Sequence, residues 1–201
     1  MINKVVFGTT NKAKFGEYDR YFAASGISVL ELQKLVPDVP DVLERGDTYA
    51  SNALLKAQQY FHLTQLPTIS EDSGIEVTAL EGFPGINSHR WMSGTEHQRN
   101  QGLLQKLECC ADRSAQFIDV ICLYLGDTTR PRLFRGELSG EISTASHGDQ
   151  GFGYDPIFIP RGYSRTIAEL GYEVKNKISA RSQAMQKLKD FLLSDEAQFT
   201  G

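Results

Sequence analysis

The stretch FIDVICLYL, residues 117–125, is apolar almost throughout and contains one charged residue, Asp119. A strand with one face in water alternates apolar and polar side chains, whereas a strand covered on both faces is a nearly continuous apolar run. The stretch therefore predicts a strand that is buried on both faces, inside a sheet that helices cover.

The segments on either side of this strand alternate between extended and helical patterns. Helical spacing of apolar residues predicts helices at 12–24, 47–62, 98–110 and 178–192. Apolar runs predict strands at 4–8, 133–138 and 156–159, and a strand that starts at 67, breaks at 72–74 and resumes at 75–77. The alternation predicts the α/β class, and no repeat or linker divides the chain, so we expect one domain over residues 1–201.

Composition excludes several classes of protein. The 201 residues are 40% hydrophobic and 23% charged, as in ordinary globular proteins, and the net charge of −4 argues against binding a nucleic-acid polymer. No apolar segment is long enough for a signal peptide or a membrane span, so we expect a soluble, cytoplasmic protein with no membrane partner. Three cysteines, two of them adjacent, form neither a disulfide framework nor a zinc motif, and we expect reduced thiols.

Residues 9–14, TTNKAK, follow a predicted strand and open a predicted helix. Unpaired backbone N–H groups and the helix dipole make a helix start suitable for phosphate, and Lys14 adds a positive charge. An ordinary capped surface helix explains the same residues, so both interpretations stay open.

Residues 71–74, EDSG, place two carboxylates at the end of an apolar run. Adjacent side chains of a strand point in opposite directions, so Glu71 and Asp72 face one site only if the chain turns, which Gly74 permits. Carboxylates suit Mg²⁺, which binds one or two of them together with substrate phosphates, and Glu44 could complete such a site. The alternative is a polar turn that closes a strand.

Two further segments could bind a flat, polar ligand. Gly151 and Gly153 allow the backbone beside Phe152 to adopt positive φ, so that the ring could stack on a nucleobase while Asp155 forms hydrogen bonds. A glycine turn with Phe152 in the core is the alternative. Residues 175–181, KNKISAR, are either a ligand-binding or a solvated start of the last helix, and we expect residues 89–91 to be structural or to lie at a rim.

Five blocks together carry a resemblance to a known family: TTNKAKFGE at 9–17, NALLKA at 52–57, EDSGIEVTALEGFPG at 71–85, GFGYDPIF at 151–158 and KNKISAR at 175–181. In this order, and across nearly the whole chain, they resemble the inosine triphosphate pyrophosphatase family, the Ham1-like pyrophosphatases of non-canonical purine nucleoside triphosphates. The resemblance implies Mg²⁺-dependent hydrolysis of ITP, dITP and XTP to the monophosphate and pyrophosphate. It also implies a homodimer and two α/β lobes around a long mixed β-sheet flanked by helices, with a central nucleotide cleft.

The resemblance also implies roles for particular residues. Asp72 is similar to the family's catalytic carboxylate, both metal ligand and general base, and Glu44 resembles a second metal-linked acid. The implied substrate-binding residues are Thr9, Thr10, Asn11, Lys12, Ala13 and Lys14 of the triphosphate loop, Lys56 on phosphate oxygens, Ser73 beside the substrate, Phe152, Gly153, Tyr154 and Asp155 of the base pocket, and Lys175, Ala180 and Arg181 near the base.

Two positions depart from the family's pattern. Ala180 stands where the family usually has His, in Ser-His-Arg, which leaves the degree of purine selectivity open. Ser51 stands where an acid is common, which could alter a polar contact or the outer shell of the metal. We expect retained hydrolysis. The alternatives are a pyrophosphatase for another modified nucleotide, including a pyrimidine, and a nucleotide-binding sensor with weak catalysis.

Overall fold

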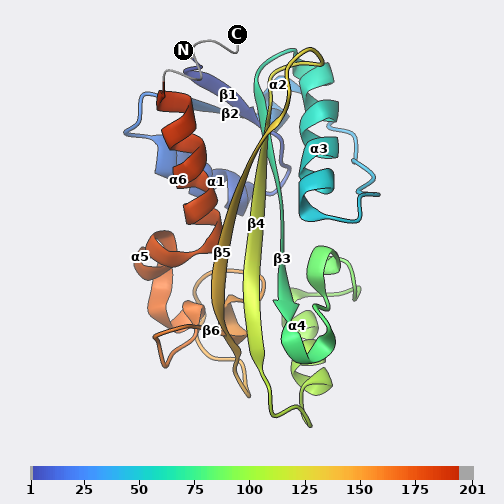
Figure 1. The fold of residues 1–201 in the computed structure, drawn as a ribbon, viewed down its shortest axis with the longest axis vertical. Helices are drawn as coiled ribbons and strands as arrows, with labels where there is room; N and C mark the ends of the chain where they lie inside the picture. The colour runs from blue at the N-terminus through green and yellow to red at the C-terminus, as the bar shows by residue number, and fades with distance from the viewer. Residues whose placement is uncertain (1, 195–201) are drawn as a thin grey trace. The chain divides into compact units, whose positions relative to one another are not determined.

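The computed structural model describes residues 2–194 and contains a mixed six-stranded sheet (Figure 1). The strand order is β2-β1-β3-β4-β5-β6, where β1 is Lys4–Phe7, β2 Ser28–Glu31, β3 Thr68–Val77, β4 Ser114–Tyr124, β5 Arg132–Ile142 and β6 Phe158–Pro160. β1 pairs in parallel with β2 and β3, and β5 pairs antiparallel with β6. The predicted α/β class and mixed sheet are confirmed.

Six α-helices accompany the strands over residues 2–194. They are α1 Lys12–Phe22, α2 Leu32–Leu35, α3 Tyr49–Thr64, α4 Glu96–Lys106, α5 Ile167–Ile178 and α6 Ala180–Leu193. The predicted helices at 12–24, 47–62 and 98–110 correspond to α1, α3 and α4, with ends that differ by at most four residues. β2, α2 and α5 were not predicted.

The chain forms two compact units. The first is built from the chain up to Asp72, Asp119–Arg135 and the chain from Ala184, and the second from Ser73–Ile118 and Gly136–Gln183. The strands β3, β4 and β5 each contribute residues to both units. The single domain over residues 1–201 stays a prediction.

The core of the first unit lies on both faces of β4. Ile121 and Leu123 belong to a buried cluster with residues of α1 and α6, whereas Cys122 and Tyr124 pack in another cluster with residues of α3. Successive strand residues point to opposite faces, so α1 and α6 cover one face and α3 the other (Figure 1). Leu123 is fully buried, which contributes about 2 kcal/mol to stability. The strand predicted to be buried on both faces is confirmed.

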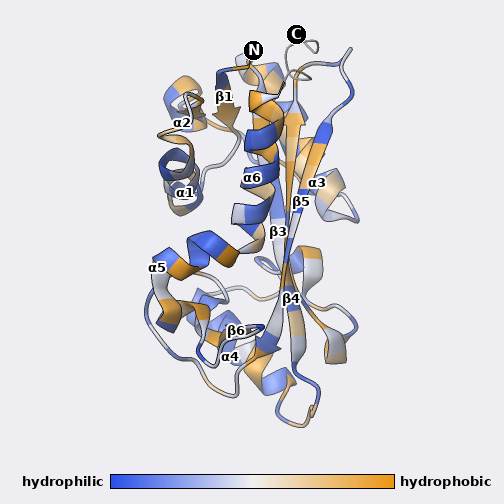
Figure 2. Ribbon diagram, turned by 60° about the vertical axis from the view of Figure 1, so that its left-hand side comes forward, coloured by the Kyte–Doolittle hydropathy of each residue, from blue (hydrophilic) through white to orange (hydrophobic). Residues whose placement is uncertain are grey.

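Helix α6 covers the sheet with an apolar face. Its residues alternate between hydrophobic and hydrophilic along the helix (Figure 2), and Leu188 and Leu192, one turn apart, are fully buried in the cluster with α1. The core of the second unit is separate and joins Ile75 of β3 with Leu103 of α4 and Ile167 of α5.

The structure corrects three local predictions. β3 runs without a break from Thr68 to Val77, so the turn expected at 72–74 is wrong; apolar Ile69 and Ile75 on either side are fully buried and keep the chain extended. The last helix begins at Ala180 and not at 178, because Ser179 is extended, with ψ 152°, and ends α5. The strand expected at 156–159 begins only at Phe158, after a short 3-10 turn.

None of the helices found within residues 2–194 has both the length and the apolar character that crossing a bilayer requires.

The three cysteines differ in exposure, which predicts their reactivity. Cys109 is exposed, whereas Cys122 is fully buried in β4 and its burial raises the pKa of the thiol to about 12. The thiolate is the reactive form, so we expect a thiol reagent at pH 8 to modify Cys109 in the native protein and Cys122 only after unfolding. Peptide mass spectrometry after timed labelling measures this; equal labelling rates for both residues in native protein would contradict it.

Candidate functional site

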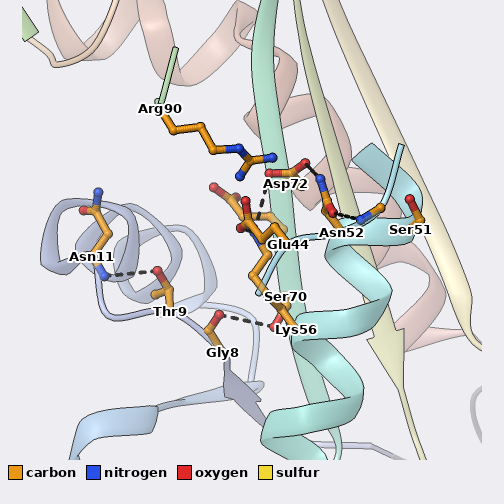
Figure 3. A network of polar contacts seen from close by, with 12 residues as sticks. Gly8, Thr9, Asn11, Glu44, Ser51, Asn52, Lys56, Ser70, Asp72 and Arg90 are labelled. Carbon is orange, nitrogen blue, oxygen red and sulfur yellow. Dashed lines mark hydrogen bonds and ion pairs between the residues drawn. The ribbon is translucent and has the colours of Figure 1, made fainter. Parts of the chain in front are cut away.

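The loop from β1 to α1 is capped by its own side chains. Asn11 precedes the helix, and its Oδ1 accepts hydrogen bonds from the backbone N–H groups of Ala13, at 2.9 Å, and Lys14, at 3.1 Å. The Asn11 N–H in turn donates to Thr9 Oγ1 at 3.1 Å (Figure 3). The expectation of unpaired N–H groups is therefore wrong for Ala13 and Lys14, while the exposed side chains of Thr10 and Lys12 remain accessible.

Gly8 fixes this loop to the sheet. Its carbonyl oxygen accepts a hydrogen bond from Ser70 Oγ at 3.2 Å. A Cβ added to Gly8 would lie 2.2 Å from Ser70 Oγ and 2.4 Å from Tyr60 Cδ2. Only glycine lets the backbone approach so closely. The loop that carries Thr9 to Lys14 is thus anchored directly on β3.

Glu71 holds the lysine of this loop. The Glu71 carboxylate is 3% exposed and lies 2.8 Å from Lys14 Nζ through Oε1, while its Oε2 accepts a hydrogen bond from Tyr18 OH at 2.8 Å. Both partners belong to α1. Glu71 therefore orients Lys14.

Asp72 points to the other side of β3, toward α3 and the loop before it. Lys56 Nζ pairs with Glu44 Oε1 and lies 3.5 Å from Asp72 Oδ1, and Asn52 Nδ2 donates to Asp72 Oδ2 at 3.1 Å (Figure 3). The predicted residues Glu44, Lys56 and Asp72 thus lie together. Sequence reasoning missed Asn52, although its spacing of four from Lys56 places both on one helix face.

The acidity of Asp72 is set by burial and by four neighbours. Burial raises the pKa of its carboxyl, Lys56 lowers it, Glu44 raises it through like-charge repulsion, and the hydrogen bond from Asn52 and the charge of Lys14 lower it. The net direction is upward because loss of hydration outweighs the cation. A carboxylate with a raised pKa is a better proton acceptor than a solvated one.

The cluster also fits a metal ion. Within residues 2–194 no group of three or more His, Cys, Asp or Glu side chains could hold a metal on its own. Glu44 and Asp72 nevertheless converge on one positive charge, the Lys56 ammonium. Two carboxylates, completed by water and phosphate oxygens, are the donor set that Mg²⁺ commonly uses.

A second cluster lies around Phe152 in the other unit. The flanking Gly151 and Gly153 have φ of 86° and 65°, as their positions in the sequence suggested. Lys175 Nζ lies 3.9 Å from the centroid of the Phe152 ring, and Arg181 Cζ lies 5.4 Å from it. Phe152 is only half-buried and contacts cations, so the alternative of a core ring is not what the structure shows.

Asp155 braces this cluster. It is 4% exposed, and its Oδ2 lies 2.7 Å from Lys175 Nζ and accepts a hydrogen bond from Phe152 N at 2.9 Å. Lys175, at the end of α5, and Arg181, at the start of α6, are themselves buried, so the interpretation of a solvated helix start is wrong. The two cations occupy a junction between helices.

Tyr154 and Gly153 are held from outside the loop. The Tyr154 hydroxyl donates to Ser88 O at 2.6 Å and accepts from Trp91 Nε1 at 2.7 Å, which confirms a structural role for Trp91. Two residues of α4 bind the backbone of Gly153: Glu96 accepts from its N–H at 2.8 Å and Asn100 donates to its carbonyl at 3.0 Å. No local pattern connects α4 with a loop more than 50 residues away, so sequence reasoning missed both.

Three further positions that the sequence analysis singled out are Ala180, Ser73 and Ser51. Ala180 is 4% exposed at the first position of α6, and Ser73 follows Asp72 in β3 and is half-buried. Ser51, in place of the acid common in the family, completes a capping box with Thr48 at the start of α3, and its Oγ accepts from Thr48 N at 3.1 Å.

A lysine at a capped helix start and two carboxylates around a second lysine define an α/β protein with a site suited to phosphate groups. Comparison with known proteins gives a narrower assignment. The chain belongs to the Ham1 family, whose family model matches residues 5–191.

Several relatives resemble the chain over nearly its whole length. A protein of Symbiobacterium thermophilum named dITP/XTP pyrophosphatase is 43% identical over 186 residues, which is 92% of each chain. One of Aquifex aeolicus with the same name is 38% identical and covers 98% of this chain and 100% of its own. Among solved structures, the Staphylococcus aureus Ham1 protein has a TM-score of 0.85 at 36% identity, with 97% of this chain and 99% of that chain covered.

The glycines beside Phe152 give a direct test of the loop. At Gly151, with φ of 86°, an added Cβ would lie 2.2 Å from Asp155 Oδ2, whereas at Gly153 nothing lies within 4 Å. Strained φ costs roughly 1–2 kcal/mol and overpacking about 1–3 kcal/mol, so we expect Gly151→Ala to lose both amounts and Gly153→Ala only the first. Urea unfolding of the two variants measures the difference; equal unfolding midpoints would show that the loop is not packed as described.

Proposed function

We propose that the protein hydrolyses non-canonical purine nucleoside triphosphates, namely ITP, dITP and XTP, to the monophosphate and pyrophosphate, and so cleanses the nucleotide pool. Membership of the Ham1 family and the two relatives named dITP/XTP pyrophosphatase support the activity. The observation that carries it is the convergence of Glu44 and Asp72 on one cation, the Lys56 ammonium. A site of this composition is suited to phosphoryl transfer, where catalysis is mostly positioning and electrostatics.

The triphosphate is bound, in this proposal, by the loop of residues 9–14 and by two lysines. Lys14, oriented by Glu71, and Lys56, beside Asp72, provide positive charges for phosphate oxygens. The exposed side chains of Thr10 and Lys12 and the hydroxyl of Thr9 add hydrogen-bond donors. The lysines offset the negative charge that grows on the departing pyrophosphate.

Asp72 accepts the proton of the attacking water in this mechanism. Its raised pKa makes it a stronger base than a solvated aspartate, and Asn52 and Lys56 hold its carboxylate in place. Glu44 and Asp72 would hold Mg²⁺, and the metal, when bound, supplies positive charge to the phosphate oxygens. Ser73, the next residue of β3, is expected beside the substrate.

The base is recognised, we propose, by the cluster around Phe152. The half-buried ring offers a stacking surface, which is worth about 1–3 kcal/mol for any base. Selectivity comes from cations: Arg181 or Lys175 donates to the 6-keto oxygen of hypoxanthine or xanthine, and adenine's amino group leaves that donor unpaired. Asp155, whose Oδ2 is already bonded, acts chiefly by holding Lys175 and Phe152.

We further propose that the protein acts in the cytoplasm as a homodimer. The resemblance to the family supports the homodimer. The net charge of −4 agrees with a small anionic substrate met by placed cations and with no binding of a nucleic-acid polymer.

A nucleotide panel tests the substrate. With Mg²⁺, we expect pyrophosphate release from ITP, dITP and XTP at least about 100-fold faster than from ATP, because a polar pocket discriminates strongly against an unpaired donor. Measuring pyrophosphate and orthophosphate separately identifies the bond that breaks. Equal rates with ITP, ATP and GTP would refute the preference for non-canonical purines. A preference for modified pyrimidines would assign another substrate, and no release from any nucleotide would favour a sensor.

Replacement of the proposed general base, Asp72, tests the mechanism. We expect Asp72→Asn to lower kcat by at least about 100-fold, because general bases contribute that much or more, while nucleotide binding persists. Single-turnover kinetics and equilibrium binding of ITP measure the two effects. A variant with wild-type kcat would remove Asp72 from the mechanism.

A further inference from the structure

Asn52 is a fully buried polar residue that joins two parts of the candidate site. Its Nδ2 donates to Asp72 Oδ2 at 3.1 Å, and its Oδ1 accepts a hydrogen bond from Gly46 N at 2.9 Å (Figure 3). Asp72 belongs to β3, and Gly46 is two residues from Glu44 in the loop before α3. One amide therefore connects the strand with one carboxylate to the loop with the other.

Only one orientation of this amide satisfies both partners. An ionised carboxylate only accepts hydrogen bonds and a backbone N–H only donates, so the NH₂ group must face Asp72 and the oxygen must face Gly46. The ionised side chain of Asp, which is of similar size, offers only acceptors, and that of Leu offers neither a donor nor an acceptor. The side chain is thus specified by chemistry, and not by packing alone.

Gly46 packs tightly against α3. A Cβ on Gly46 would lie 2.7 Å from Asn52 Oδ1 and 2.2 Å from Ser51 Oγ, so the loop backbone lies directly against the first turns of α3. The Gly46 N–H is held at this distance by the Asn52 carbonyl. A shift of Asn52 would move the loop, and with it Glu44.

The two oxygens of Asp72 have different neighbours as a result. Oδ2 accepts from the neutral Asn52 amide, and Oδ1 lies toward Lys56, which also pairs with Glu44. Asn52 and Lys56 are four residues apart on α3, so both donors come from one helix face. The neutral donor fixes Asp72 without neutralising its charge.

We propose that Asn52 is a positioning residue for the reaction: it directs Asp72 Oδ1 toward Lys56 and Glu44 and sets the distance between the two carboxylates. This inference rests on the proposed function, because it concerns the carboxylates that would hold Mg²⁺. It assigns a role to a residue that acts through Asp72 and through the loop of Glu44. Such outer partners commonly change metal affinity by 10- to 100-fold.

The test compares Asn52→Leu with wild-type protein. Leu has a similar size but neither donor nor acceptor, so Asp72 and the Glu44 loop lose their common partner. We expect Mn²⁺ to bind the nucleotide-free variant at least about tenfold more weakly, as measured by electron paramagnetic resonance. We also expect kcat at saturating Mg²⁺ to fall by at least about tenfold. The KM for ITP should change less than about threefold, since base and phosphate contacts remain.

Ser51→Ala is the matched control, and Asn52→Ser is the second variant if Asn52→Leu does not fold. Ser51 is adjacent on α3 and caps Thr48 but contacts neither carboxylate, so its loss should lower the unfolding midpoint and leave Mn²⁺ affinity and kcat unchanged. A merely structural role for Asn52 would give the same result as Ser51→Ala, and this would overturn the inference. Wild-type protein that neither binds Mn²⁺ nor hydrolyses ITP would instead refute the proposed function.

Discussion

The alternation of side chains along β3 is the constraint on which the candidate site depends. Adjacent residues of an extended strand point to opposite faces, and here the two neighbours are the carboxylates Glu71 and Asp72. One therefore meets α1 and holds Lys14, and the other meets α3 and Lys56. A single strand thus supplies separate anchors for two lysines, each of which the proposed mechanism assigns to phosphate oxygens.

Burial makes the stability of the protein depend on these ion pairs. A buried charge is stable only when it is paired and its hydrogen bonds are satisfied, and removal of one partner typically costs about 3–5 kcal/mol. The pair of Asp155 and Lys175 shows this most clearly, since both side chains are under 10% exposed and Asp155 Oδ2 lies 2.7 Å from Lys175 Nζ. The charges that would contact a nucleotide are therefore oriented before any ligand arrives.

The sequence predicted the parts of the fold that depend on local pattern. The apolar run at 117–125 indicated a strand covered on both faces, and the helical spacing at 47–62 indicated α3. The prediction of a turn at 72–74 was wrong because the polar residues suggested exposure. The structure instead buries Glu71 and Asp72 and pairs them with distant lysines. Asn52 and Asn100 were missed for the same reason: their partners are 20 and 53 residues away in the chain.

The attachment of Gly153 to α4 has a consequence for recognition. Both backbone polar groups of this residue are bound, one by Glu96 and the other by Asn100, while Asp155 accepts from the neighbouring Phe152 N–H. A loop that is already ordered loses little conformational entropy when a ligand binds. Differences in affinity between ligands at this loop should therefore appear mainly as differences in residence time, because the rate of association does not await a rearrangement.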